Sequence, residues 1–351
     1  MLRSLLVAIT ATICIAVTAC SDSQWVLRES QARSWCAGPD TAITPDLRIS
    51  GCTTLIQSGR ETQSILAVAF CNRGNAYQDY KGDYDRAIQD YDQAIRLKPD
   101  YPTAFNNRGD AYHAKGDYDR AIQDYDQATR LNPDYFQAFN SRGVAYREKG
   151  NYDRAIQDYD QVIRLKPDHF RAFNNRGNAY EHKADYDRAI QDYDQAIRLK
   201  PDYATAFYNR GYAYQHKGDY DRAIQDYDQA VRLKPDDAAA LNNRCWARAV
   251  ANKALEAALS DCNESLRLRP DDAGTMHSRG FVHFRMGRYD EAIADFDNSL
   301  SRDPKSADML YMRGLAKGVR HDTAGSDADI AEAKAIDPKV AERYAGYGVK
   351  P

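Results

Sequence analysis

The sequence predicts an all-α protein in which eight helix pairs are stacked one after another. Three observations lead to this fold class: a proline recurs at an almost constant interval, each interval holds two segments with apolar residues at helical spacing, and a glycine-containing turn separates these segments. Six of the seven proline intervals are 34 residues and one is 35. The prolines are Pro99, Pro133, Pro167, Pro201, Pro235, Pro270, Pro304 and Pro338.

The second repeat shows how each helix pair is encoded. Residues 102–114 and 118–131 are expected to be helices, because their apolar positions recur every three or four residues. Gly116 suits the left-handed residue that ends a helix, and the Asp117 carboxylate can accept amide protons at the start of the next helix. Pro133 ends the second helix, since the residue before a proline is disfavoured in helical conformation.

The same pattern divides the rest of the chain. The first five repeats are near-copies of one another, and the last three diverge but keep the proline interval. The repeats are 67–101, 102–135, 136–169, 170–203, 204–237, 238–272, 273–306 and 307–340.

These repeats resemble the tetratricopeptide repeat (TPR), over about 270 of the 351 residues. The family's positions appear in repeat two as Phe105, Gly109, Tyr112, Ala121, Tyr125, Ala128 and Pro133. The resemblance implies antiparallel helix pairs stacked into a right-handed α-α superhelix, whose concave groove is lined by the first helices. The residue types give an independent reason for stacking: Gly109 and Ala121 let two helices approach closely, Tyr125 fills the space beside them, and no pair can bury its apolar face alone.

The N-terminus resembles an export signal. Residues 5–17 form an uncharged, mostly apolar run behind Arg3, and this run is too short to span a bilayer. Residues 1–19 are therefore expected to be a signal peptide, and Val17-Thr18-Ala19-Cys20 resembles the motif of bacterial lipoproteins, with lipidation at Cys20. The alternative is plain cleavage after Ala19 or a nearby small residue, which leaves a soluble periplasmic or secreted protein.

The two ends of the repeat array are expected to be caps. Residues 20–66 are interpreted as a linker and a degenerate N-terminal half-repeat, because residues 46–56 align with the second helix of repeat one at 85–95. Residues 341–351 are expected to form a short C-terminal cap or tail.

Cysteines occupy matching positions in the cap and in repeat six. Cys52 and Cys262 take the aromatic position of the second helix, and Cys36 and Cys245 precede them by 16 and 17 residues, as Gly109 precedes Tyr125 by 16. Both pairs therefore fall where two helices of one repeat touch. In the oxidising compartment that export implies, we expect disulfides Cys36–Cys52 and Cys245–Cys262, with Cys71 free.

Two charged positions recur in all eight repeats. An arginine precedes the glycine position, and an aspartate precedes the aromatic position of the second helix. A ladder of structural ion pairs explains why the two are retained together, and a row of ligand-binding arginines is the alternative. The pairs are Arg73 and Asp90, Arg108 and Asp124, Arg142 and Asp158, Arg176 and Asp192, Arg210 and Asp226, Arg244 and Asp261, Arg279 and Asp295, and Arg313 and Asp329.

A peptide-binding groove is predicted from two further positions of the first helices. An asparagine precedes each arginine in five repeats, at Asn72, Asn107, Asn175, Asn209 and Asn243, and a similar ladder lines the groove in some superhelical TPR proteins. Because an amide can both donate to and accept from peptide main chain, this row is expected to grip the backbone of an extended peptide. The alternative is a surface asparagine copied with the repeat. Three residues further on, the polar residues Asn75, Asp110 and Asn178 and the apolar Val144 give way to Tyr212, Trp246, Phe281 and Leu315. With Tyr208, the side chains Tyr212, Trp246 and Phe281 are expected to form an aromatic pocket; packing against neighbouring helices is the alternative.

Composition and motifs argue against several classes of function. Lys+Arg total 48 and Asp+Glu 51, a net charge of -3, which disfavours nucleic-acid binding. No phosphate loop, metalloprotease or nucleophile-elbow motif occurs, so neither an enzyme nor a cofactor is expected. His182 and His216 share a position in successive repeats but have no third ligand, so we expect no metal site.

The sequence thus favours a non-enzymatic scaffold that binds a protein or extended peptide partner in the bacterial cell envelope. We expect a periplasmic protein that contacts the outer membrane only through its lipid anchor. Two alternatives stay open: a structural assembly factor of the outer-membrane or pilus lipoprotein type, and a regulator of a cell-wall enzyme.

Overall fold

The computed structural model describes residues 28–38 and 43–349, and within these ranges every regular element is a helix. The all-α prediction and the stacking of helix pairs are thereby confirmed. The expected signal peptide and the Cys20 lipidation site lie outside the described residues. The chain separates into two compact parts, residues 1–167 and 168–351, which are described in turn.

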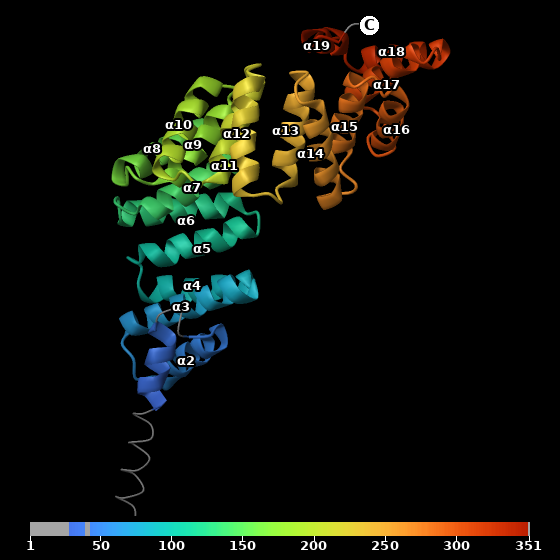
Figure 1. Ribbon diagram of the computed structural model, residues 1–351. Helices are drawn as coiled ribbons and strands as arrows, with labels where there is room; N and C mark the ends of the chain where they lie inside the picture. Colours follow the sequence, from blue (N-terminus) through green and yellow to red (C-terminus); the bar gives the residue numbers. More distant parts are fainter. Residues whose placement is uncertain (1–27, 39–42, 350–351) are drawn as a thin grey trace, which may run out of the picture. The chain divides into compact units, whose positions relative to one another are not determined.

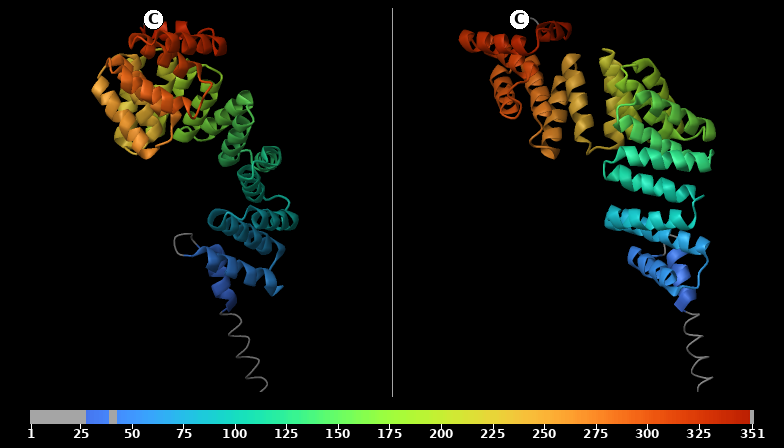
Figure 2. Two further views of the ribbon diagram at one scale, coloured as in Figure 1. Left: turned by 90° about the vertical axis from the view of Figure 1, so that its right-hand side faces the viewer. Right: turned by 180° about the vertical axis from the view of Figure 1, so that it is seen from behind.

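The N-terminal part holds the cap and the first three helix pairs, which form successive layers coloured from blue to green in Figure 2. Residues 28–37 are helical, so the cap contains a first helix as well as the predicted second one. The following helices are α2 (Pro45–Ser58), α3 (Gln63–Lys81), α4 (Tyr84–Leu97), α5 (Pro102–Ala114), α6 (Tyr118–Leu131), α7 (Phe136–Glu148) and α8 (Tyr152–Leu165).

The C-terminal part holds five further pairs and a short final helix beside α17 and α18 (Figure 1). The pairs are α9 (Phe170–His182) with α10 (Tyr186–Leu199), α11 (Ala204–His216) with α12 (Tyr220–Leu233), α13 (Ala238–Val250) with α14 (Leu255–Leu268), α15 (Ala273–Arg285) with α16 (Tyr289–Leu300), and α17 (Ala307–Val319) with α18 (Thr323–Ile336). The final helix is α19 (Val340–Gly346).

The turn inside each pair is set by the residues that the sequence singled out. Gly116 adopts a left-handed conformation with φ 78°, and the Asp117 side chain accepts a hydrogen bond from the backbone N–H of Arg120. This arrangement ends α5 and begins α6 without leaving that amide unsatisfied. In repeat four an alanine, Ala184, holds the same left-handed position with φ 55°, which costs an L-residue free energy that glycine does not pay.

The core is a repeated layer of small residues and tyrosines. Alanines on both helices are fully buried in every pair except α15 with α16, where Val282 takes the buried place on the first helix, and the second-helix tyrosines of repeats one to five are buried too. Those tyrosines are Tyr91, Tyr125, Tyr159, Tyr193 and Tyr227, each no more than 1 % exposed. Each tyrosine packs on the first helix of its own pair, and a buried alanine of the next first helix can join the same layer, as Ala145 does with Tyr125.

Candidate functional site

Glycine and tyrosine set the distance between the two helices of a repeat. A Cβ atom built on Gly109 would lie 2.7 Å from the Cε1 atom of Tyr125, closer than real Cβ atoms approach. The same contact recurs in repeats one to five, and Phe296 takes the tyrosine's place against Gly280 in repeat seven. Any side chain at the glycine position would therefore push the helices apart or displace the ring.

The tyrosine hydroxyl reaches through the helix pair to the first-helix residue that follows the glycine. Tyr125 donates to Asp110 Oδ1 at 2.7 Å, and burial is the main reason that the pKa of Asp110 is raised above its ordinary value. Equivalent bonds join Tyr91 to Asn75 and Tyr193 to Asn178, both at 2.8 Å. These polar first-helix residues thus satisfy a buried hydroxyl, which sequence reasoning missed.

Where the first helix lacks this polar residue, the hydroxyl opposite has no acceptor there or is itself absent. In repeat three Val144 replaces it, and the hydroxyl of Tyr159 is buried without a hydrogen-bond partner. Repeats six to eight have an apolar residue at this position and no tyrosine opposite. The pairs are Trp246 with Cys262, Phe281 with Phe296, and Leu315 with Ile330. The change from polar to apolar along the first helices is therefore matched inside the core.

The asparagine row lies at the junctions between repeats. Asn107 donates from Nδ2 to Asn75 Oδ1 at 2.8 Å, and Asn209 donates to Asn178 Oδ1 at 2.9 Å and Asn174 Oδ1 at 3.0 Å. The cap and repeat six use the same type of bond: Asn72 donates to the Cys36 carbonyl at 3.1 Å, and Asn243 donates to the Tyr208 hydroxyl at 3.0 Å. Asn175 is half-buried in α9.

These bonds change how the asparagines can act. The predicted grip on peptide main chain needs free amide donors, but Asn209 already uses both of its amide protons within the protein. The row acts first as a polar seam that joins neighbouring repeats. Asn209 stays partly exposed, so at this position the carbonyl oxygen, rather than the N–H groups, is the atom offered to a partner.

The arginine and aspartate positions form the ion pairs that the sequence suggested. Arg108 makes a two-bond contact with Asp124 of its own repeat, at 2.8 and 2.6 Å, and also pairs with Asp92 of the preceding repeat at 2.5 Å. The same double linkage is seen at Arg142, Arg210, Arg244 and Arg313. The guanidinium groups are therefore committed to aspartates, and the structure favours the ion-pair ladder over an arginine row for ligands.

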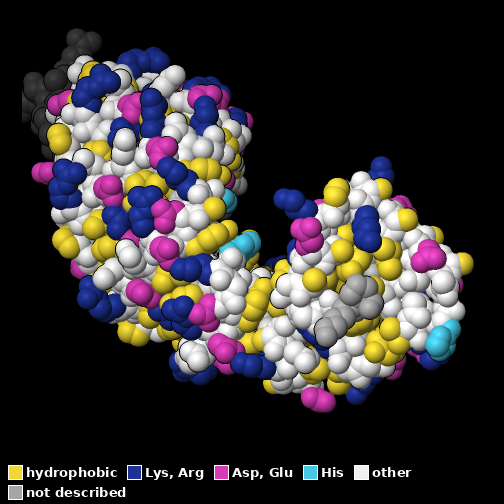
Figure 3. Space-filling model, turned by 90° about the horizontal axis from the view of Figure 1, so that it is seen from above, with side chains coloured by type: hydrophobic (Ala, Val, Ile, Leu, Met, Phe, Trp, Pro, Cys, Tyr) yellow, Lys and Arg dark blue, Asp and Glu magenta, His cyan; other side chains and the backbone are white. Residues whose placement is uncertain are grey.

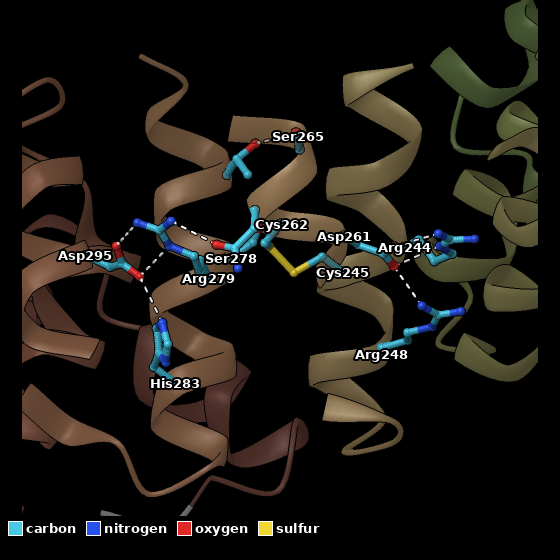
Figure 4. The surroundings of a disulfide bond; sticks show 12 residues. Arg244, Cys245, Arg248, Asp261, Cys262, Ser265, Ser278, Arg279, His283 and Asp295 are labelled. Carbon is cyan, nitrogen blue, oxygen red and sulfur yellow. Dashed lines mark hydrogen bonds and ion pairs between the residues drawn. A yellow bond between two sulfur atoms is a disulfide. The ribbon is translucent and has the colours of Figure 1, made fainter. Parts of the chain in front are cut away.

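Both cysteine pairs lie within disulfide distance. Cys36 and Cys52 join the two cap helices with a Cα–Cα distance of 4.6 Å, and Cys245 and Cys262 join α13 to α14 at 5.6 Å. Figure 4 shows the second bond where other repeats have the glycine–tyrosine contact, flanked by the Arg244–Asp261 ion pair. A covalent link thus replaces an aromatic contact. Cys71 is free and buried, and burial raises the pKa of its thiol to about 11.

The predicted aromatic pocket is only partly as expected. Tyr208, Tyr212 and Trp246 are half-buried, and the Tyr212 ring lies 4.4 Å from the ring of His216. Phe281, however, is fully buried, so its assignment as an exposed pocket residue is wrong. It lies beneath Trp246, with ring centroids 5.1 Å apart, because the neighbouring repeat and the C-terminal segment cover it.

The C-terminal segment, residues 340–349, covers Trp246 and Phe281 on the first helices of repeats six and seven. The Tyr347 ring meets the edge of Trp246 with centroids 5.9 Å apart, and the Tyr344 ring meets Phe281 at 5.8 Å. The pattern of the repeats gave no sign of this contact, since Trp246 and Tyr347 are far apart in sequence.

A polar hollow of about 250 Å³ lies at the other end of the chain, beside the cap. Its lining includes Arg48, Asn72, Asn75 and Asp79. Arg48 is only 7 % exposed and donates to the carbonyl oxygens of Cys36 at 3.2 Å and Gly38 at 2.9 Å. The guanidinium therefore holds the first cap helix against the second.

Charged side chains of both signs are interspersed on the surface. Figure 3 shows Lys and Arg side chains next to Asp and Glu side chains over the face in view, without a basic area. Within residues 28–38 and 43–349 no group of three His, Cys, Asp or Glu side chains is arranged to hold a metal ion. No helix in the described part of the chain combines the length and apolar character that a membrane crossing requires.

Solved structures with similar folds are repeat proteins. A tetratricopeptide repeat protein from Parabacteroides merdae is 20% identical, with 71% of this chain and 98% of that chain covered and a TM-score of 0.54. The APC/C hetero-tetramer Cut9-Hcn1 is 19% identical, with 71% and 50% covered and a TM-score of 0.55. Pseudomonas aeruginosa pilF is 18% identical, with 61% and 96% covered and a TM-score of 0.54. At these identities the likeness shows the fold alone.

The sequence itself matches family models over most of the repeat array. A model described as TPR repeat matches residues 80–116 and 109–147, and models described as tetratricopeptide repeat match 140–204, 204–237 and 246–317. No curated protein matches the chain. With the 34-residue period and the stacked helix pairs, these matches show that the chain belongs to the tetratricopeptide repeat family.

Proposed function

We propose that this protein is a non-enzymatic scaffold that binds a protein or peptide partner along its first helices. TPR folds typically serve as protein-interaction scaffolds, and one observation on this chain carries the proposal. In repeats one to six, each first helix presents half-buried polar or aromatic side chains at the same positions, as with Asn107 and Asn209, or Tyr208 and Tyr212. A partner that runs along several repeats would meet the same chemistry at regular intervals.

The side chains set limits on how the partner is held. The amide donors of Asn209 and the guanidinium groups of the ladder are already bonded within the protein. Recognition around Asn209 therefore rests on its acceptor oxygen and on aromatic contacts with Tyr208 and Tyr212. A partner with free N–H groups or cationic side chains suits such a surface.

The cellular location is part of the same proposal. The leader-like residues 1–19, followed by Cys20, support export and a lipid anchor in the bacterial envelope. Two disulfides buried in helix contacts support an oxidising compartment. Replacing Cys20 by serine should move the protein from the membrane fraction to the soluble periplasmic fraction. An unchanged distribution would exclude the anchor.

Affinity capture from envelope extracts tests the binding function. We expect a partner to be retained by the wild-type chain and lost with Tyr212→Ala, because truncating an aromatic anchor typically weakens an interface by about 2 kcal/mol. Leu199→Ala is the control, since Leu199 is 37% exposed on the second helix of repeat four. Equal capture by both variants would place the interface elsewhere, and a single stoichiometric complex would favour a structural assembly role.

A further inference from the structure

The surface beneath the C-terminal segment has the chemistry of a binding site. It is built from Tyr220, Trp246, His277, Phe281, Arg285 and Tyr311, called the aromatic surface below. These residues come from four successive repeats, five to eight, and all lie in the C-terminal part of the chain. Its rings meet the two tyrosines of the segment, and its polar groups meet their hydroxyl and main-chain oxygens.

Tyr344 is the deeper of the two tyrosines. It is 1 % exposed, and its ring lies 5.8 Å from that of Phe281 and 5.6 Å from that of Tyr311. Its hydroxyl is 3.0 Å from Nε2 of His277. The pocket therefore accepts a phenol rather than a plain phenyl ring, because a phenylalanine would leave the imidazole nitrogen without its partner.

Tyr347 is held three residues later by edge contacts. Its ring stands at 86° to Trp246, with centroids 5.9 Å apart, and at 88° to Tyr220, with centroids 6.4 Å apart. The carbonyl oxygens of Tyr347 and Gly348 both accept hydrogen bonds from the Arg285 guanidinium. Two tyrosines three residues apart, followed by acceptor oxygens, thus describe what the aromatic surface binds.

Arg285 shows that the segment is not the best ligand for this surface. The guanidinium is half-buried against the Phe281 ring, 5.0 Å from its centroid, and burial lowers its pKa. Within the described residues its hydrogen bonds go to main-chain carbonyls of the segment, and its Nε is buried without a hydrogen-bond partner. A carboxylate would pair with it more strongly than a neutral carbonyl does.

The segment is also attached in a way that allows release. α19 has only seven residues, too few to be stable as an isolated helix. Its ion pairs run from Arg343 to Asp308 at 3.0 Å and to Asp337 at 2.8 Å, with all three side chains 31% to 39% exposed. Such exposed pairs add little stability and are screened by salt.

We propose that the aromatic surface binds a partner segment with two tyrosines three residues apart followed by a carboxylate, and that residues 340–349 occupy this surface as an internal ligand which the partner displaces. The proposal rests on the scaffold function above and names the partner chemistry for one end of it. The internal ligand covers the aromatic surface until a partner segment that carries the carboxylate displaces it.

The test uses the full chain and a labelled peptide with the sequence of residues 340–348, made with a free carboxylate or a terminal amide. In Tyr347→Ala the internal ligand is weakened, so the acid peptide should bind about tenfold more tightly than to wild type, since occupancy by the segment lowers apparent affinity. Glu342→Ala, at an exposed position of α19, is the control and should behave as wild type. The acid should bind at least about tenfold more tightly than the amide, and Tyr347→Ala/Arg285→Gln should lose that preference.

A second measurement needs no variant. Trypsin cleavage after Arg343 in the wild-type chain, read as loss of residues 344–351 by intact mass, should accelerate about threefold or more when the acid peptide is added, because cleavage follows the released population. If the peptide neither binds Tyr347→Ala nor changes this cleavage, the segment is a permanent cap and the proposal fails. Exchange of segments between two copies, seen as a dimer by gel filtration, would also overturn it. Either failure leaves the envelope capture experiment unaffected, so the two proposals are judged separately.

Discussion

Two tyrosine hydroxyls in neighbouring repeats provide a matched test of how the core is stabilised. The hydroxyl of Tyr125 donates to the half-buried carboxylate of Asp110 at 2.7 Å, whereas that of Tyr159 is buried without a hydrogen-bond partner. A hydrogen bond to a charged group contributes about 1.5–3 kcal/mol, so Tyr125→Phe should lower the free energy of unfolding by about 2 kcal/mol. Tyr159→Phe removes an unsatisfied hydroxyl and should leave stability unchanged or raise it by up to about 1 kcal/mol.

The two variants are compared by urea denaturation followed by circular dichroism, with hydrogen exchange of α6 and α8 as the local readout. The local readout is needed because repeat arrays need not unfold in a single step. Val144→Asn gives the internal control, since it offers Tyr159 the acceptor that Asn75 offers Tyr91. In that background Tyr159→Phe should become destabilising by about 1 kcal/mol. Equal losses for Tyr125→Phe and Tyr159→Phe in the wild-type background would refute the reasoning.

Three further substitutions or conditions probe the turn, the ladder and the C-terminal segment. Ala184→Gly should raise the free energy of unfolding by about 1 kcal/mol, because it relieves a left-handed alanine; a loss of stability in thermal melts would contradict this. Arg210→Leu should cost about 2–3 kcal/mol, because it leaves Asp226 unpaired at 4% exposure, whereas Arg232→Leu, on an exposed face, should change stability by less than about 0.5 kcal/mol. Burial lowers the pKa of His277 from 6.5 to about 4, while Asp308 opposes this shift and Arg343 adds to it. His277 therefore binds a proton more readily when the segment is released than when it is docked, as the pH falls from 6.5 to about 4. Docking of residues 340–349 should then weaken by up to about 3 kcal/mol, seen as faster hydrogen exchange corrected for intrinsic rate; exchange that is independent of pH would exclude this role.

Local chemistry explains why the helix positions could be predicted from the sequence. The predicted helices at 102–114 and 118–131 coincide with α5 and α6, because Gly116, Asp117 and Pro133 act on their immediate neighbours. The ion-pair partners were also predictable, since their spacing is fixed by the repeat. For the first cap helix only the spacing of Cys36 from Cys52 implied a helix, and its extent over residues 28–37 was not predicted, because it lacks the other positions that define the repeats.

The candidate site was harder to predict because its contacts depend on which atoms are already bonded. Asn209 has the residue type of a peptide-gripping amide, but only the structure shows that both of its amide protons are used within the protein. Trp246 and Phe281 read as exposed aromatics, yet the segment that covers them begins nearly sixty residues after Phe281. The repeat period predicts contacts within a repeat and between neighbouring repeats, but it cannot predict the contacts of a terminal segment that folds back over several repeats.

The reach of the C-terminal segment also constrains how this chain can change in length. Near-identical repeats are prone to gain or lose a copy when a gene recombines with itself, and the polar seams would accept an extra copy between like neighbours. The segment, however, touches Tyr220 in repeat five, Trp246 in repeat six and Phe281 in repeat seven from a starting point just beyond repeat eight. An added or deleted repeat among these four would carry the segment out of register with its contacts. Repeats can therefore be added before the one that holds Tyr220, whereas the number of repeats from there to the C-terminal segment is fixed.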